Sequence, residues 1–345
     1  MLEAAKQALD KVITKSRIHF YKPIQIAEIL YHDRIFGDID LGNLETYRTK
    51  SKAWRDTVCI ALLGRISTSS AKFQDDLFNA IPPQFIAELG KFNRKHNGAV
   101  ESYIYNKFIG KYMQLNNALN YCLNANKANF EISHFISLFW YEAGLKRSLD
   151  KVYEIITHSL FDTLAQTLEL SITLYINENK LDILKEFEDF AKSVMCLDSK
   201  NLFTTQKARI YRVGVTNAAD RGLDMHANWG VAIQIKHLSL DIELAESIIS
   251  QIQSDRVIIV CKDAEKDIIL SLLAQIGWKN KIQSIITESH LITWYEKAMR
   301  GKYANLLGDK LLETLCLEIT EEFPSVKELP EILKERHYEN IKGEL

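Results

Sequence analysis

The spacing of apolar residues changes once along this chain, and that change limits the folds that it can adopt. From the first residue to about residue 175, apolar positions recur every three or four residues, as in IAEILYHDRIF and FIGKYMQLNNALNYCL, which is the helical period. After residue 197 the apolar segments become short and rich in β-branched residues. The pattern therefore predicts a helical first half and a second half that contains a sheet.

The second half alternates short strands with helices. Between the strands we expect a helix of about three turns that starts at Asp241, and another helix follows over 264–276. An amphipathic helix is expected over 181–197, before the first strand. The order α, β, β, β, α, β calls for a mixed sheet flanked by helices, so the fold class is α/β, or α+β overall. The expected strands are 208–215, 223–227, 231–240, 256–262 and 282–288.

At 345 residues the chain is long for a single domain. We expect a mainly helical domain over residues 1–178. A second domain, over residues 179–345, contains the mixed sheet and ends in a helical C-terminal extension.

Charge and cysteine content exclude several classes of protein. The 43 basic and 45 acidic side chains nearly cancel, so no global charge indicates a nucleic-acid partner. No apolar run approaches the roughly 20 residues that span a bilayer, and the N-terminal segment lacks the apolar core of a secretion signal. Five widely spaced cysteines without a CxxC pair argue against a zinc site and against disulfides. We therefore expect a cytoplasmic protein with reduced thiols and no membrane partner.

One polar trio stands out in the β-containing half. Gln234 and Lys236 are two apart in a predicted strand, so they share one face, while Ile235 points to the other. Asp224 starts the preceding strand, and only the short connection NWG at 228–230 separates the two strands. A hairpin of that size brings Asp224 within reach of the other two side chains.

These groups suit hydrolysis of a phosphodiester. A carboxylate beside a second oxygen ligand suits Mg²⁺, and the backbone carbonyl of Ile235 can add a third ligand. A lysine at the rim can position an attacking water and offset charge on a phosphoryl oxygen. The trio Asp224, Gln234 and Lys236 is therefore the predicted catalytic and metal site.

The segment GLDMHANWGVAIQIK resembles the Asp, then Glu or Gln, any residue, Lys signature of the PD-(D/E)xK nuclease superfamily. Within it, the longer segment RVGVTNAADRGLDMHANWGVAIQIKHLSL is similar to the HaeII-like type II restriction endonucleases. The resemblance implies a Mg²⁺-dependent endonuclease that cuts double-stranded DNA at a short palindromic target. It also implies a homodimer, a cognate DNA methyltransferase that protects the host, and DNA recognition by the helical domain.

Gln234 replaces the usual glutamate of this signature and gives up a negative charge at the metal. A carboxylate from the helix before the first strand compensates in many members, and we choose Glu188 because it lies nearer the apolar stripe of 181–197 than Glu186 does. Two alternatives stay open. One is another PD-(D/E)xK nuclease that acts in repair or on methylated DNA, and the other is a non-cleaving DNA-binding protein that keeps only the fold.

DNA contacts are expected in two places. The segment 90–112 is basic and interleaved with tyrosines, so it can lie on phosphates and present amide groups to base edges, although a solvated helix and loop is the competing interpretation. Beside the trio, the segment 216–221 can hold a phosphate. His226 shares the face of Asp224, where a purely structural histidine is the alternative. The candidate DNA-binding residues are Lys91, Arg94, Lys95, Asn106, Lys107, Asn217, Arg221 and His226.

Overall fold

The computed structural model describes residues 1–67, 70–141, 145–213, 223–236, 254, 256–275, 282–323, 331–338 and 341. The chain forms two compact units. The first contains Met1–Ala125, Glu131–Val152 and Cys316–Leu345, and the second contains Asn126–Phe130 and Tyr153–Leu315. This grouping divides the chain within two helices rather than near residue 178, and it places the C-terminal residues with the N-terminal helices. The functional division between recognition and catalysis stays a prediction.

The first unit is helical throughout its described part, as the helical period predicted. Ser70 caps α4, because its hydroxyl oxygen accepts a hydrogen bond from the backbone N–H of Phe73 at 3.2 Å. Proline occupies the first position of α5, where its missing N–H costs no helical hydrogen bond. The helices are α1 (Leu2–Lys15), α2 (Tyr21–Phe36), α3 (Lys50–Leu63), α4 (Ala71–Ala80), α5 (Pro83–Lys95), α6 (Ala99–Asn124), α7 (Ile132–Tyr141) and α15 (Glu331–Glu335).

A buried glutamate of α2 fixes the C-terminal segment in this unit. Glu28 is 1% exposed and accepts two hydrogen bonds from the guanidinium of Arg336, at 2.6 and 3.0 Å. The hydroxyl of Tyr105 on α6 donates a third hydrogen bond at 2.6 Å. Burial raises the pKa of Glu28, and the hydrogen bonds from Arg336 act against that rise. The segment around Arg336 therefore packs in the N-terminal core, although it lies about 300 residues from α2 in sequence.

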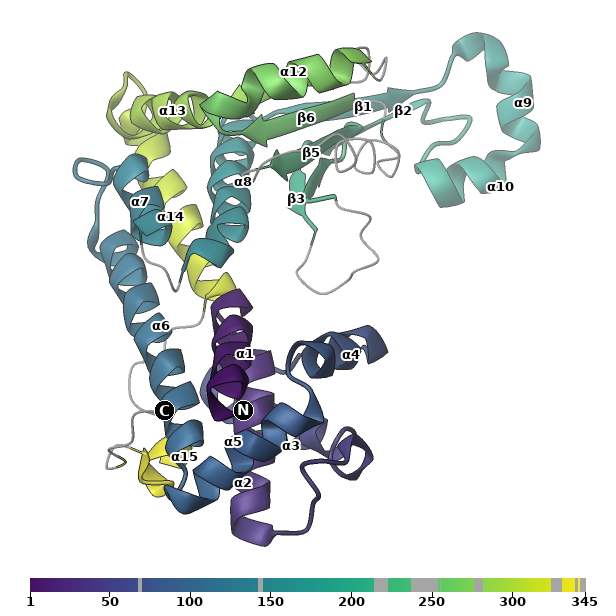
Figure 1. Cartoon of the computed structure of the whole chain (residues 1–345). Helices are drawn as coiled ribbons and strands as arrows, with labels where there is room; N and C mark the ends of the chain where they lie inside the picture. Colours follow the sequence, from purple (N-terminus) through teal and green to yellow (C-terminus); the bar gives the residue numbers. More distant parts are fainter. Residues whose placement is uncertain are drawn as a thin grey trace. The chain divides into compact units, whose positions relative to one another are not determined.

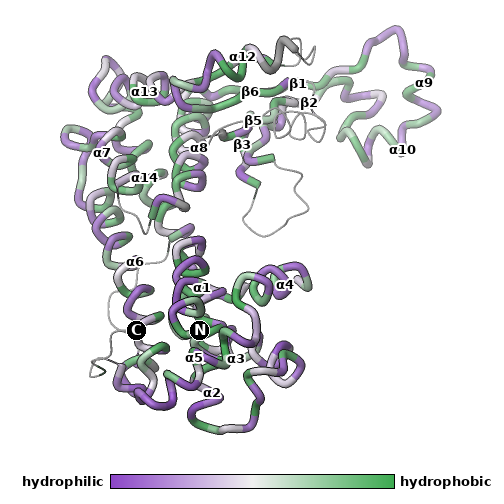
Figure 2. Tube along the Cα trace, in the orientation of Figure 1, coloured by the Kyte–Doolittle hydropathy of each residue, from purple (hydrophilic) through white to green (hydrophobic). Residues whose placement is uncertain are grey.

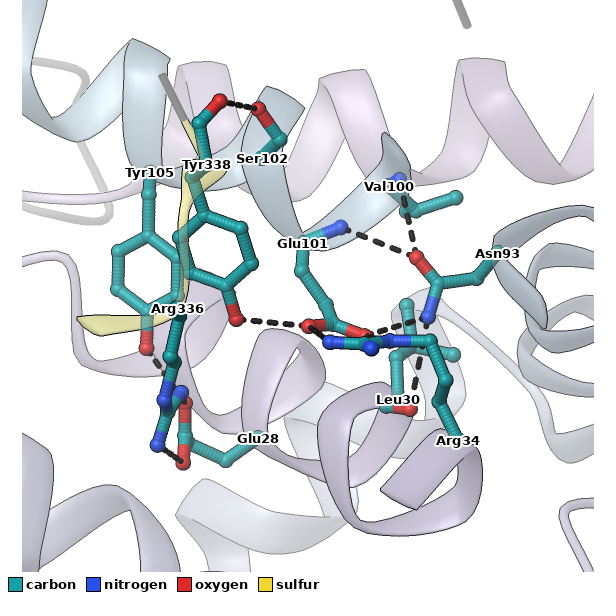
Figure 3. Close-up of polar contacts among 10 residues, drawn as sticks. All are labelled: Glu28, Leu30, Arg34, Asn93, Val100, Glu101, Ser102, Tyr105, Arg336 and Tyr338. Carbon is teal, nitrogen blue, oxygen red and sulfur yellow. Dashed lines mark hydrogen bonds and ion pairs between the residues drawn. The ribbon is translucent and has the colours of Figure 1, made fainter. Parts of the chain in front are cut away.

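A second buried glutamate sits in the same network (Figure 3). Glu101 on α6 is fully buried and receives both arms of the Arg34 guanidinium at 2.8 Å. The amide of Asn93 donates to it at 2.6 Å, and the hydroxyl of Tyr338 donates at 2.7 Å. Every charged group drawn in this network has an opposite charge or a hydrogen-bond donor beside it, as a buried ion requires.

The second unit contains a mixed sheet, as predicted. Among the described residues, five strands follow the order β3-β4-β5-β6-β7. The pairs β3·β4 and β4·β5 are antiparallel, while β5·β6 and β6·β7 are parallel. These strands confirm the five that the sequence predicted, with closer bounds. They are β3 (Ile210–Arg212), β4 (Met225–Ala227), β5 (Val231–Lys236), β6 (Arg256–Cys261) and β7 (Ile282–Thr287).

The central strand β5 is buried on both faces, which explains its run of apolar residues. On one face Ala232 packs with Val257, Ile259 and Ile269. On the other face Ile233 is 1% exposed. Helix α12 (Lys266–Gln275) follows β6, as predicted for 264–276, and the helix expected from Asp241 lies outside the described residues. The other helices of the sheet-containing region are α8 (Leu149–Thr167), α13 (Glu288–Arg300) and α14 (Ala304–Glu322).

The prediction was wrong in two places. Residues 171–175 form a strand, β1 (Ser171–Tyr175), which pairs with β2 (Phe203–Lys207) in an antiparallel two-stranded sheet. The single helix expected over 181–197 is interrupted at Phe187, whose φ of −112° and ψ of 32° are not helical. It consists of α9 (Leu181–Glu186), α10 (Glu188–Phe190) and a π-helical turn over Ala191–Met195. A periodic pattern of apolar residues does not reveal such an interruption, because the stripe continues across it.

Within the described part of the chain, no helix is both long enough and apolar enough to cross a bilayer.

Candidate active site

Two members of the predicted trio meet in the structure. Asp224 precedes β4 and Gln234 lies in β5, and the turn between these strands contains Gly230 with a φ of 87°, which favours glycine. The Oδ2 atom of Asp224 accepts a hydrogen bond from Nε2 of Gln234 at 2.5 Å. It accepts a second hydrogen bond from the backbone N–H of Ile235 at 2.7 Å. The hairpin therefore holds the carboxylate against the amide, as its length predicted.

Lys236 is the last residue of β5, two positions after Gln234, and its backbone pairs with Cys261 of β6. Its side chain lies outside the part of the chain that the structure describes. The third member of the trio is thus at the expected place in the sheet.

The amide of Gln234 is nearly inaccessible to solvent, with 1% of its residue surface exposed. Its nitrogen is bonded to Asp224, but its oxygen Oε1 has no hydrogen-bond partner among the described residues. A buried amide oxygen without a partner costs free energy, so such atoms are rare in folded proteins. A carboxylate and an amide oxygen are hard ligands of the kind that Mg²⁺ prefers. The residues present therefore fit a divalent cation held by Asp224 and Gln234.

The upstream carboxylate chosen from sequence has local partners. Glu188 begins α10, and its Oε1 accepts hydrogen bonds from the backbone N–H of Ser199 at 3.0 Å and from its hydroxyl at 2.5 Å. Lys192 lies 3.5 Å from its other oxygen. The hydrogen bonds from Ser199 lower the pKa of Glu188. The arrangement fixes Glu188 within the segment between β1 and β2, and its role as a second metal carboxylate stays a prediction.

Two carboxylates that the sequence did not single out lie beside the sheet. Asp162 is buried in α8, and its Oδ1 has no hydrogen-bond partner among the described residues. Helix α8 borders the sheet because Nε2 of His158 donates to the carbonyl of Ile210 at 2.8 Å. Asp263 follows β6 and accepts two hydrogen bonds from Ser289, at 2.8 and 3.1 Å. Of these two carboxylates, only Asp263 could have been predicted from the sequence, because the carboxyl ends of parallel strands meet at one edge of a sheet.

The predicted DNA contacts are distributed over both units. Within the first unit, Lys91 forms an ion pair with Glu88 at 2.6 Å, and Arg94 forms one with Asp33. The side chains of Lys95, Asn106 and Lys107 are exposed on α5 and α6.

In the second unit His226 is exposed on β4, where its ring stacks on that of Tyr211 with the centroids 5.3 Å apart. The register places His226 opposite Ala232. It therefore shares the face of Gln234, as expected. Asn217 and Arg221 lie outside the described residues.

The sheet and the contact between Asp224 and Gln234 agree with the class of protein that the sequence suggested. A mixed sheet with two antiparallel and two parallel pairings, and an aspartate against a glutamine on neighbouring strands, matches what the PD-(D/E)xK resemblance implied. Comparison with known proteins is more specific. The chain belongs to the HaeII restriction endonuclease family, whose model matches residues 5–338.

Two curated relatives cover nearly the whole chain. The type II restriction enzyme HaeII of Haemophilus aegyptius is 55% identical over 341 residues, which are 98% of this chain and 97% of that protein. The type II restriction enzyme NgoBI of Neisseria gonorrhoeae is 54% identical over 333 residues, which are 96% of this chain and 94% of that protein. No solved structure matches the chain. The resemblance to HaeII-like endonucleases is therefore confirmed over both units.

Proposed function

We propose that this protein is a type II restriction endonuclease that hydrolyses double-stranded DNA at a short palindromic target. The observation that carries the proposal is the identity of more than half with two type II restriction enzymes along almost the entire chain. The aligned region covers both units, so it spans the segments that contain the candidate catalytic residues and the candidate recognition residues. The contact between Asp224 and Gln234 supports the same reaction from the chemistry of the site.

Mg²⁺ is the proposed cofactor, and Asp224, Gln234 and the backbone carbonyl of Ile235 would hold it. When bound there, the ion supplies Lewis acidity for the attack of water on a phosphodiester. Asp224 contributes the negative charge, and Gln234 contributes a neutral oxygen that has no other described partner. Lys236 orients the attacking water and offsets charge on the phosphoryl oxygen. Glu188 is the proposed second carboxylate.

Double-stranded DNA is the proposed substrate, and a homodimer matches the two-fold symmetry of a palindromic target. Lys91, Arg94, Lys95, Asn106 and Lys107 are the proposed contacts of the helical region. Lys95 and Lys107 are exposed and have no carboxylate within ion-pair distance in the described part of the chain, which favours them over Lys91 and Arg94.

Near the sheet, Asn217, Arg221 and His226 complete the proposed DNA contacts. A cognate DNA methyltransferase would protect the host genome, and both proteins would act in the cytoplasm, where DNA is located. A reducing compartment would keep the five cysteines as thiols.

Plasmid cleavage tests the function directly. Supercoiled plasmid is incubated with the wild-type protein in Mg²⁺ or EDTA, and with Lys236→Ala in Mg²⁺. Discrete fragments in Mg²⁺, their absence in EDTA and their loss in Lys236→Ala support the proposal. A smear of products would identify a nuclease without a target sequence. No cleavage with any divalent metal or plasmid would favour the non-cleaving DNA-binding protein. Lys200→Ala, at an exposed position between α10 and β2, is the matched control and should cleave as the wild type does.

A further inference from the structure

A helical segment connects the two strands of the small sheet, β1 and β2. We call residues 171–207 the arm, and it consists of β1, α9, α10, the π-helical turn and β2 (Figure 1). The arm has a small interior, in which Leu184, Ala191 and Leu197 are buried. An isolated pair of strands is marginally stable in water. The arm therefore gains from any further surface that covers it.

A stripe of apolar side chains runs along the outside of the arm. The stripe consists of Ile183, Phe187, Phe190 and Val194, and each of these residues is more than half exposed. Ile183 lies on α9, Phe187 at the interruption between the helices, Phe190 on α10 and Val194 in the π-helical turn, so the stripe follows the chain through these elements. Hydrophobic residues recur along this part of the trace between hydrophilic ones (Figure 2). Because the buried interior of the arm uses other positions, the stripe is free to bind a partner.

The charges around the stripe disfavour DNA as that partner, because Lys185 and Lys192 lie within ion-pair distance of Asp182 and Glu188, and further carboxylates remain. Phe187 and Phe190 are set among carboxylates in the sequence EFEDF, where Glu186 and Asp189 are exposed. A phosphate backbone would be repelled by these groups. A second copy of the stripe is disfavoured for the same reason, because packing stripe on stripe would bring the two sets of carboxylates together.

The same unit contains a surface with the complementary properties. A cavity of about 570 Å³ lies between α8, the sheet and α13, and its walls are almost entirely apolar. Phe161, Trp294 and Leu307 are among the lining residues. Lys297 and Lys302 also line it and are exposed, so their ammonium groups stand at its solvent side. The cavity thus combines aromatic walls with positive charge, whereas the stripe combines aromatic side chains with negative charge.

We propose that the stripe of one protein molecule docks into this cavity of a second copy, and that the second copy returns the same contact. This inference rests on the homodimer of the proposed function and names its interface. Phe187 and Phe190 enter the apolar cavity, and Glu186 and Asp189 approach Lys297 and Lys302. Such a reciprocal exchange forms a closed dimer with two-fold symmetry, because the same two copies make both contacts. Aromatic anchors in a pocket surrounded by charged groups are typical of the residues that dominate binding energy in interfaces.

Charge exchange across the interface tests the proposal. The variants Glu186→Lys/Asp189→Lys and Lys297→Glu/Lys302→Glu each place like charges together, and the combination of all four restores opposite charges. Sedimentation equilibrium without DNA measures the dimer dissociation constant. We expect each double variant to raise that constant by roughly tenfold or more, and the fourfold variant to return within about threefold of the wild type. The control Lys200→Glu/Lys310→Glu changes two exposed lysines outside both surfaces and should leave the constant unchanged.

A photocrosslinking amino acid at position 187 identifies the contact independently of charge. We expect crosslinks between two chains, with the joined peptide from the second chain containing residues 294–307. Thermal unfolding of each variant confirms that the protein remains folded, and plasmid cleavage is scored in parallel. A wild-type dimer that keeps its dissociation constant in both double variants would overturn this interface while the endonuclease activity stands. Crosslinks within one chain, or between two arms, would also overturn it. A monomeric wild-type protein would remove both the interface and the proposed homodimer.

Discussion

Two buried polar clusters of this protein differ in how completely their hydrogen bonds are satisfied. In the first unit, Glu101 receives two hydrogen bonds from Arg34 and one each from Asn93 and Tyr338. In the second unit, Asp224 and Gln234 contact each other, yet the amide oxygen of Gln234 has no described partner. The first cluster is complete within the protein. The second has an oxygen available for a ligand.

This difference separates a structural role from a catalytic one. When all partners of a buried ion pair are present, no charge is left uncompensated. Removing one partner destabilises the fold, because the other charge then stays buried without compensation. A buried oxygen without a donor costs free energy until something binds it, and protein sites that bind ligands often carry such a cost. Substitutions in the two clusters should therefore affect different properties: stability in the first unit and cleavage in the second.

The largest effect is expected for Asp224→Asn. The amide keeps an oxygen that can accept from Ile235, but it loses the negative charge that would hold the metal. We expect the cleavage rate to fall by on the order of 10³, because metal stabilisation of the transition state is worth several kcal/mol. The free energy of unfolding should change by only about 1–2 kcal/mol, the value of one charged hydrogen bond.

Single-turnover cleavage of a plasmid and urea unfolding provide the two measurements for this variant. Asp309→Asn is the matched control, since Asp309 forms an exposed ion pair with Lys127 in the same unit. Full activity of Asp224→Asn would show that this carboxylate is not the metal ligand.

Glu101→Gln should show the opposite behaviour. It leaves the partly buried guanidinium of Arg34 without its charged partner, so we expect the free energy of unfolding to fall by about 1–3 kcal/mol. Cleavage per folded molecule should be unchanged at a temperature where the variant is folded. Glu88→Gln, in the exposed pair with Lys91, should leave the unfolding midpoint where it is. If Glu101→Gln loses more activity than its unfolded fraction accounts for, the distinction between the two clusters is wrong.

His19 shows that burial and nearby charges can shift the pKa of a group that is not catalytic. Burial lowers its pKa to about 4, and the neighbouring Arg65 and Arg17 act in the same direction. The unfolded chain therefore binds more protons than the native state between pH 6.5 and 4, so stability is lost as the pH falls through this window. At pH 5 the loss relative to pH 7 amounts to about 2 kcal/mol.

Urea unfolding at several pH values checks this expectation. His19→Gln removes the titrating group, so its stability should depend less steeply on pH between 6.5 and 4 than that of the wild type. His134→Gln, at an exposed position, is the control and should keep the wild-type slope. An unchanged slope in His19→Gln would assign the acid sensitivity of the protein to other groups.

Sequence reasoning succeeded where the physics was local. Alternation along β5 was enough to put Gln234 on one face with Ile233 and Ile235 on the other, and the short turn was enough to bring Asp224 to Gln234. Both inferences use spacing over fewer than 15 residues. The identity of the family could be predicted for the same reason, because the signature is one continuous segment.

Most of what the sequence did not reveal depends on long-range contacts, and the interruption of the helix at Phe187 is the local exception. The strand β1 could not be recognised because its partner β2 lies 36 residues further on at the register of Ser171 and Lys207. No local pattern reveals that Arg336 binds Glu28 and so places the C-terminal segment beside α2. The apolar residues of the arm were visible in the sequence, but only the structure shows that the described part of the chain leaves Phe187 and Phe190 exposed.

The last variant has the smallest expected effect. It is also the most direct test of the comparison between the two buried clusters, because it changes one atom of the incomplete cluster. Gln234→Glu replaces the amide nitrogen, now 2.5 Å from Asp224, with a second carboxylate oxygen. Without metal the two carboxylates repel each other and the protein should be less stable, whereas with Mg²⁺ the added charge should tighten binding. We expect the Mg²⁺ concentration for half-maximal cleavage to fall by roughly tenfold, since ligand charge tunes the affinity of such sites. Titrations of thermal stability and of cleavage against Mg²⁺ measure the two effects separately. If Mg²⁺ stabilises the wild type and Gln234→Glu equally, the amide oxygen is not a metal ligand, and the unsatisfied atom of the second unit needs another explanation.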